Sequence, residues 1–221
     1  MYKIAIFDFD GTLVDSAPGI VDVMHQVVDE YQLPAEVAEH WKTLIGIPLV
    51  DQVEIICPTR PRDWHQKVVE RYREIYDANS IALCPPFPGL LNMLQTLKRI
   101  GIASTIATSK RREIVEPVLD HHKLMHFFHL ILGQQDVTQH KPHPELVLNT
   151  LKHMTLNPHD AVVIGDSTYD LEMARNAGVD AIGVLTGVHN RAQLETAKPT
   201  YIVENLEQAT ELILQGRKRV A

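Results

Sequence analysis

Cysteine is scarce in this 221-residue sequence, and Cys57 and Cys84 stand in no CxxC or zinc-like spacing. Neither a disulfide framework nor a thiolate metal site is therefore indicated, and a reducing compartment fits. An excess of basic residues is also lacking, because 21 Lys and Arg stand against 28 Asp and Glu for a formal charge of −7. Since nucleic-acid binding needs a basic excess, we expect no nucleic-acid partner.

Long apolar runs are missing as well. No stretch approaches the roughly 18 apolar residues of a membrane span, and the opening MYKIAIFDFD lacks the apolar core of a signal peptide. We therefore expect a cytoplasmic protein with no membrane partner, either a monomer or a homodimer. With 45% hydrophobic residues, the chain can bury one sizeable core and a smaller appended domain.

Short continuous apolar runs recur along the chain, with helical patterns between them. Continuous rather than alternating apolar residues predict strands buried on both faces. The alternation of strands and helices predicts a parallel sheet with right-handed crossovers. The apolar runs cover residues 4–7, 102–107, 130–132, 161–165 and 181–185. The helical patterns cover residues 90–99, 111–119, 144–153 and 170–177.

The segment from residue 17 to about 82 breaks this alternation. It shows no convincing strand, and its helical patterns cover residues 19–31, 37–44, 49–56 and 63–79. We expect an all-helical insertion that returns through the proline-rich CPPFPG of residues 84–89. The predicted fold is a Rossmann-like, doubly wound α/β core with a small inserted helical cap domain. The core comprises residues 1–15 and 83–221, and the cap residues 16–82.

Two carboxylates follow the first predicted strand. Asp8 and Asp10 are two apart in extended chain, so their side chains should point the same way from the carboxyl edge of the sheet. Such a pair is relieved by a cation, by proton sharing or by different protonation states, which is how acid and base roles are separated. Taken alone, this DxD is equally compatible with an acidic turn.

Three more polar clusters follow predicted strands and should lie at the same edge, where open α/β sheets bind ligands. They are Thr108-Ser109-Lys110, the turn around Lys141, and the segment containing Asp166 and Asp170. Each has an ordinary explanation, as a helix cap or a solvated charge. Asp166 and Asp170 are four apart, so we expect them to share a helix face. Four polar clusters at strand ends together favour one site.

Phosphoryl transfer is the chemistry that would use all four clusters. Carboxylates alone repel a phosphate dianion, so a hard divalent cation is needed, and Mg²⁺ suits a partial carboxylate shell. One carboxylate can then attack phosphorus while a second moves the proton. Hydroxyls, backbone amides and a lysine can hold the equatorial oxygens, where charge accumulates.

The sequence resembles the haloacid dehalogenase superfamily over nearly its whole length, specifically the phosphoglycolate phosphatase-like branch with a helical cap after the first motif. That motif stands here as FDFDGTLVDS, from residue 7 to 16. The second motif matches Thr108 and the third matches Lys141 in its KP turn. The fourth, GDxxxD, matches Asp166 and Asp170.

The resemblance implies a Mg²⁺-dependent phosphatase that forms an aspartyl-phosphate on a small phosphorylated substrate. Asp8 would be the nucleophile and Asp10 the general acid and base. Mg²⁺ would be held by Asp8, the backbone carbonyl of Asp10, and Asp166. Asp10 also separates the chain from the dehalogenases, which lack an aspartate at that position.

The remaining motif residues would bind the transferred phosphoryl group or support those that do. The resemblance assigns phosphoryl binding to Thr108, Ser109 and Lys141, and implies that Asp170 acts through water or orients Lys141. Ser109 stands where asparagine is frequent, and His140 where glycine is frequent. These two departures concern substrate contacts and leave the core mechanism in place.

The substrate stays open, with phosphoglycolate, pyrophosphate and nucleoside monophosphates as candidates. A hexose phosphomutase is an alternative, but the expected cap loop of residues 45–49 has no charged or amide side chain, which favours a small leaving group or pyrophosphate. A non-catalytic binding module would be expected to lack Asp8 or Asp10. Five cationic cap residues should form a solvated face or, alternatively, contact the substrate: Arg60, Arg62, Lys67, Arg71 and Arg73.

Four histidines cluster near a predicted helix end, and two of them, His122 and His126, should share one helical face. No carboxylate or cysteine accompanies them, so a surface role is favoured over a metal site. The cluster consists of His121, His122, His126 and His129.

Overall fold

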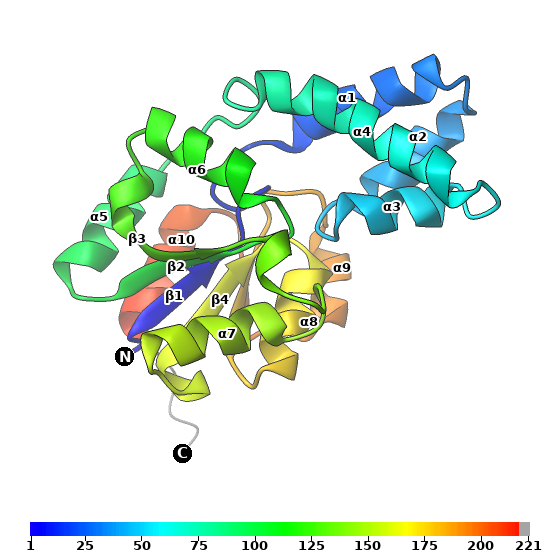
Figure 1. Cartoon of the computed structure of the whole chain (residues 1–221). Helices are drawn as coiled ribbons and strands as arrows, with labels where there is room; N and C mark the ends of the chain where they lie inside the picture. Colours follow the sequence, from blue (N-terminus) through cyan, green and yellow to red (C-terminus); the bar gives the residue numbers. More distant parts are fainter. Residues whose placement is uncertain (217–221) are drawn as a thin grey trace.

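A six-stranded parallel sheet forms the centre of the protein, which we describe from a computed structural model for residues 1–216 (Figure 1). The strand order is β3-β2-β1-β4-β5-β6, and all neighbouring strands are parallel. The predicted doubly wound α/β core is thereby confirmed. The strands are β1 (Ile4–Phe7), β2 (Ala103–Ala107), β3 (Phe128–Leu132), β4 (Ala161–Gly165), β5 (Asp180–Val184) and β6 (Tyr201–Val203).

Helices cover both faces of the sheet, because side chains of successive strand residues point to opposite faces. In β1, Ala5 and Phe7 pack into one apolar cluster, and Ile4 and Ile6 into another. On the first face lie α5 (Leu90–Arg99), α6 (Arg112–His121) and α10 (Leu206–Gln215). On the second lie α7 (Glu145–Met154), α8 (Thr168–Asn176) and α9 (Arg191–Thr196). Three short 3-10 helices cover Met125–Phe127, Gln134–Asp136 and Pro158–Asp160.

The register of the central strands determines where the site lies. Phe7 at the end of β1 is opposite Ile106 of β2 and Ile164 of β4. The chain therefore leaves all three strands at nearly the same level. The first residues beyond them, Asp8 and Asp166 among them, are brought to one edge of the sheet.

Four helices between β1 and α5 form a separate layer beyond this edge, which we call the helical insertion (Figure 1). They are α1 (Ala17–Glu30), α2 (Ala35–Lys42), α3 (Leu49–Ile56) and α4 (Arg62–Asn79), at the positions that the sequence predicts. Trp41, Val53 and Val68 are fully buried in it. The limits of a cap domain at residues 16 and 82 stay a prediction. No helix in the described part of the chain is both long and apolar enough to cross a bilayer.

The predicted common helix face of His122 and His126 is wrong. Helix α6 ends at His121, and a separate 3-10 helix begins at Met125. Between them Lys123 has a φ of 59°, a left-handed conformation that an α-helix cannot contain. The two histidines therefore belong to different elements.

Candidate active site

A buried lysine joins two of the predicted carboxylates. Lys141 Nζ donates to Asp8 Oδ1 at 2.8 Å and to Asp170 Oδ1 at 2.6 Å, although the three side chains come from different elements. Burial lowers the pKa of Lys141, but the charges of Asp170 and Asp8 outweigh this effect and raise the pKa overall. Lys141 therefore stays an ammonium ion and fixes the position of both carboxylates.

Helix α8 begins at Thr168, two residues before the predicted pattern of residues 170–177, and Asp166 is not its N-cap. Ser167 is its N-cap, accepting from the Asp170 backbone N–H at 3.4 Å and donating to Asp170 Oδ2 at 2.5 Å. Asp166 thus precedes the helix, so the expectations that it shares a helix face with Asp170 or caps the helix are wrong. Its Oδ1 instead accepts from Thr12 Oγ1 at 3.0 Å, which ties it to the loop after β1.

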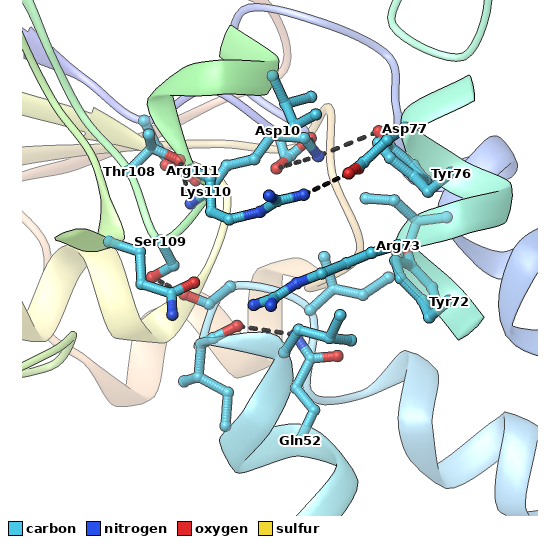
Figure 2. Close-up of a pocket in the computed structure, with 18 of the residues that line it drawn as sticks. Asp10, Gln52, Tyr72, Arg73, Tyr76, Asp77, Thr108, Ser109, Lys110 and Arg111 are labelled. Carbon is cyan, nitrogen blue, oxygen red and sulfur yellow. Dashed lines mark hydrogen bonds and ion pairs between the residues drawn. The ribbon is translucent and has the colours of Figure 1, made fainter. Parts of the chain in front are cut away.

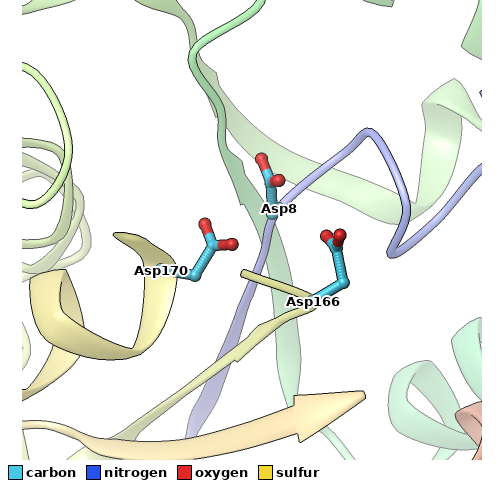
Figure 3. Close-up of side chains that lie close together, drawn as sticks. All are labelled: Asp8, Asp166 and Asp170. Atoms are coloured by element: carbon cyan, nitrogen blue, oxygen red, sulfur yellow. The ribbon is translucent and has the colours of Figure 1, made fainter. Parts of the chain in front are cut away.

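Three carboxylates converge at this edge of the sheet. Asp8, Asp166 and Asp170 are buried and offer oxygens that all lie within 4.8 Å of one another (Figure 3). Burial, and then the charge of Asp170, raise the pKa of Asp8 to about 7. Burial, followed by the charges of Asp170 and Asp8, raises the pKa of Asp166 well above its usual value. The ionised carboxylates therefore carry negative charge that the protein does not fully compensate, and a bound cation would compensate it.

The cluster suits a hard divalent cation, because its donors are all oxygens. Glycine backbone packs closely around one side of it: a Cβ on Gly187 would lie 1.7 Å from Asp166 Oδ2, and one on Gly11 would lie 2.4 Å from it. Asp170 already accepts hydrogen bonds from Lys141 and Ser167. Asp8 and Asp166 are consequently the two carboxylates with oxygens best placed for a metal ion.

The raised pKa of Asp8 makes stability depend on pH in a defined direction. Its pKa rises from 3.8 in the reference state to about 7 in the folded protein. The protonated form therefore contributes stability that is complete below about pH 4 and is lost as the pH rises through about 7. Because a metal ion binds the ionised carboxylates, Mg²⁺ should stabilise the protein more at high pH than at low pH.

We therefore expect Mg²⁺ to raise the melting temperature most on the alkaline side. At about 100 times its dissociation constant, Mg²⁺ should add about 2.7 kcal/mol, or about 5 to 10 °C for a chain of this size. The shift should nearly vanish at about pH 5, where Asp8 is protonated. Calorimetry with EDTA or Mg²⁺, at about pH 5 and on the alkaline side, measures the shift in melting temperature. An equal shift under the two conditions would contradict the assignment of these carboxylates to a metal site.

Asp10 lies apart from the three-carboxylate group and binds a different lysine. Lys110 Nζ donates to its two carboxylate oxygens at 2.9 and 3.0 Å, and Ser16 Oγ donates to Oδ1 at 2.6 Å. Lys110 also donates to the hydroxyl of Tyr76 in α4 at 3.0 Å. Lys110 belongs to one of the predicted polar clusters, but the sequence predicts no role for its side chain. Its contact with Asp10 spans 100 residues, which no local pattern reveals.

The two hydroxyls after β2 have different surroundings. Thr108 is 1% exposed, and its Oγ1 accepts from the Lys110 backbone N–H at 3.1 Å. Ser109 Oγ donates to the backbone carbonyl of Gly46 in the helical insertion at 2.8 Å. Ser109 thus connects the core to the insertion, and its predicted contact with a phosphoryl group stays a prediction.

A cavity lies between the sheet edge and the helical insertion, with about 750 Å³ of empty space that is partly open to solvent (Figure 2). The core contributes Asp8, Asp10, Thr108 and Asp166 to its lining. The predicted site residues of three strand ends therefore face one space. The insertion contributes Ile45, Gly46, Ile47, Leu49, Gln52, Tyr72, Arg73, Tyr76 and Asp77, among others.

Comparison with known proteins agrees with this geometry. Residues 5–184 match the family described as haloacid dehalogenase-like hydrolase. The chain belongs to this family. A relative from Dickeya dadantii named "Probable phosphatase IndB" is 33% identical to this hydrolase, over 94% of this chain and 92% of the relative. "Phosphoglycolate phosphatase 1" from Pseudomonas aeruginosa is 29% identical, over 96% and 82%.

A solved structure extends the likeness to the fold. A haloacid dehalogenase-like protein from Bacteroides fragilis superposes on this hydrolase with a TM-score of 0.89 and 31% identity, covering 95% of this chain and all of the other. The superfamily and the fold class that the sequence predicts are confirmed.

Proposed function

We propose that this haloacid dehalogenase-like hydrolase is a Mg²⁺-dependent phosphatase that passes a phosphoryl group to Asp8 and then to water. The observation that carries the proposal is a buried Asp8 carboxylate, bound by Lys141 at 2.8 Å, beside Asp166 and facing the cavity. Relatives whose names include "phosphatase" and "phosphoglycolate phosphatase" support the same reaction.

The metal ion would be held by Asp8, Asp166 and the backbone carbonyl of Asp10. Bound there, Mg²⁺ supplies the positive charge that lets a phosphate dianion approach two carboxylates. Lys141 adds a second positive charge from within the protein, and Asp170 orients it through the 2.6 Å contact.

The protein's own groups perform the two transfers in sequence. Asp8 forms a bond to phosphorus while the bond from phosphorus to the leaving-group oxygen breaks, and Asp10 gives that oxygen a proton. Asp10 then takes a proton from water as the water attacks phosphorus and frees Asp8. Thr108, Ser109 and Lys141 bind the phosphoryl oxygens, where charge accumulates.

The cavity favours a small phosphorylated metabolite, with phosphoglycolate as the first candidate. The loop that contains Ile45, Ile47 and Leu49 contributes an apolar surface to the cavity, as the sequence predicts. Such a surface offers no hydrogen bonds to the hydroxyls of a hexose. Pyrophosphatase activity is the second candidate, and nucleotidase and phosphomutase activities rank below it. A non-catalytic binding module is disfavoured, since Asp8 and Asp10 are both present.

Metal removal tests the proposal directly. We expect phosphate release from at least one member of a panel of phosphoglycolate, pyrophosphate, a nucleoside monophosphate and a hexose phosphate. Release should stop with EDTA and return with excess Mg²⁺, because the carboxylates cannot accept a phosphate dianion without the cation. Release that is unaffected by EDTA would contradict the proposal, and phosphoryl transfer to a sugar without release would indicate a phosphomutase.

A further inference from the structure

One cationic side chain in the cavity, that of Arg73, has no hydrogen bond or ion pair within the described part of the chain. Lys110 is paired with Asp10, and Arg111 Nη2 donates to Asp77 Oδ2 at 2.5 Å. Arg73 lines the same cavity, and within residues 1–216 its side chain forms neither a hydrogen bond nor an ion pair. Asp8 and Asp166 belong to the metal and phosphoryl end. Among the described residues, Arg73 is thus the cation of this cavity whose side chain has no hydrogen-bonded or ion-paired partner.

The position of Arg73 directs this charge into the cavity. Figure 2 shows its side chain reaching from α4 into the space between Arg111 and Gln52. Burial, and then the charge of Arg111, lower the pKa of Arg73, while Asp77 and Glu70 partly oppose them. An arginine nevertheless stays charged, and Asp77, whose charge partly offsets that of Arg73, is already bound by Arg111.

We infer that Arg73 binds a second anionic group, a carboxylate or a phosphate, on the leaving group of the substrate. This inference rests on the proposed function, because it takes the transferred phosphoryl group to lie at Asp8. A guanidinium can bind either anion through two parallel hydrogen bonds. The apolar lining around Ile47 and Leu49 makes an unpaired charge costly and a matched one favourable.

The inference narrows the substrate class. Phosphoglycolate and pyrophosphate each carry a second anionic group beyond the transferred phosphoryl group. Hexose monophosphates and nucleoside monophosphates have neutral leaving groups. Arg73 would therefore select phosphoglycolate and pyrophosphate. The cavity would distinguish substrates by the charge of the leaving group rather than by the hydroxyl pattern of a sugar.

The other cationic residues of this segment have different surroundings. Arg71 donates to Glu30 at 2.6 Å and to Glu74 at 3.0 Å outside the cavity, and the Arg60 guanidinium lies 5.2 Å from the centre of the Trp64 ring. Of the five cationic residues named from the sequence, Arg73 alone lines the cavity among the residues described. Arg71 therefore provides a matched control on the same helix.

The test compares substrates with charged leaving groups and substrates with neutral ones. Phosphoglycolate is paired with hydroxyethyl phosphate, in which an alcohol replaces the carboxylate, and pyrophosphate is paired with methyl phosphate. Arg73→Gln should lower kcat/KM for the charged compounds by about 10- to 100-fold, the effect of losing a charged hydrogen bond. The neutral compounds should change by less than about threefold.

Two further variants complete the test. Arg73→Lys should recover part of the loss, because it restores the charge but not the two-bond geometry. Arg71→Gln should leave kcat/KM unchanged for the charged and the neutral compound of each pair. A loss confined to phosphoglycolate identifies a carboxylate as the bound group, and one confined to pyrophosphate identifies a phosphate. Equal losses on charged and neutral compounds, or no loss on any, would overturn the inference.

A binding measurement separates this inference from the proposed function. If the wild type releases phosphate from no compound, the proposed function fails. Calorimetric binding of phosphoglycolate and hydroxyethyl phosphate in an Asp8→Asn background still reports on Arg73. Weaker binding of phosphoglycolate alone in the added Arg73→Gln variant supports the inference, and unchanged binding overturns it.

Discussion

Asp8→Asn is expected to lower phosphate release by at least about 10⁴-fold, the scale at which loss of a nucleophile acts. The amide keeps the shape of the side chain but is too weak a nucleophile to attack phosphorus. A phosphate assay with Mg²⁺ over long incubation measures the residual rate. Activity within tenfold of the wild type would contradict the role of Asp8 as nucleophile.

Two controls show that this loss is chemical rather than structural. Asp15→Asn changes an exposed aspartate of the same motif, so its activity should stay within about threefold of the wild type. Asp8→Asn should also melt at a temperature no lower than the wild type in EDTA at alkaline pH. The variant removes a buried charge whose pKa burial raises to about 7, so it no longer loses stability as the pH rises through that value.

Asp10→Asn should separate the two chemical steps. Phosphorylation of Asp8 by an aryl phosphate needs little general-acid catalysis by Asp10, because the leaving group departs without a proton. Hydrolysis of the intermediate needs a base for water, so we expect it to slow by about 10² to 10⁴-fold. Rapid-quench kinetics with nitrophenyl phosphate should show a burst of nitrophenol, with about one equivalent per enzyme, followed by a slow phase.

The structure shows which contacts around position 10 the Asp10→Asn variant keeps. Lys110 keeps its hydrogen bond to Tyr76, and Ser16 can still bind an amide oxygen at position 10. The control variant Lys110→Met removes the partner of Asp10 but keeps the Asp10 carboxyl group. It should therefore show no burst of nitrophenol. Slow release without a burst in Asp10→Asn would place the role of Asp10 in the first step alone.

The fold could be predicted from the sequence where the physical signal is local. All four residues of β1 and all five of β4 are buried, which is what a continuous apolar run indicates. The meeting of Asp8, Thr108 and Asp166 in one cavity follows from the same prediction, since parallel strands in register end together.

Strand β6 was not predicted from the sequence because its signal is short. β6 contains only Tyr201–Val203, and two of its three residues are partly exposed at the edge of the sheet. The following helix α10 was likewise not predicted. Asp166 lies outside α8 because Ser167 caps the helix through its hydrogen bonds with Asp170, a tertiary detail that the spacing of the two aspartates does not reveal.

The side chains that give the cavity its charge pattern depend on tertiary contacts. Arg71 and Arg73 lie two residues apart on α4, so their side chains point about 200° apart around the helix. One meets Glu30 of α1 outside the cavity and the other enters the cavity. The sequence could propose a cationic contact from this segment, but it could not say which arginine makes it.

The central claim is that Asp8 carries the phosphoryl group. The most direct measurement quenches Asp10→Asn with acid during turnover of an aryl phosphate and locates the modified peptide by mass spectrometry. The account predicts one added phosphoryl group, on Asp8, that forms only with Mg²⁺ and is absent when Asp8→Asn is introduced as well. Phosphate release without any such adduct, or an adduct on another residue, would contradict it.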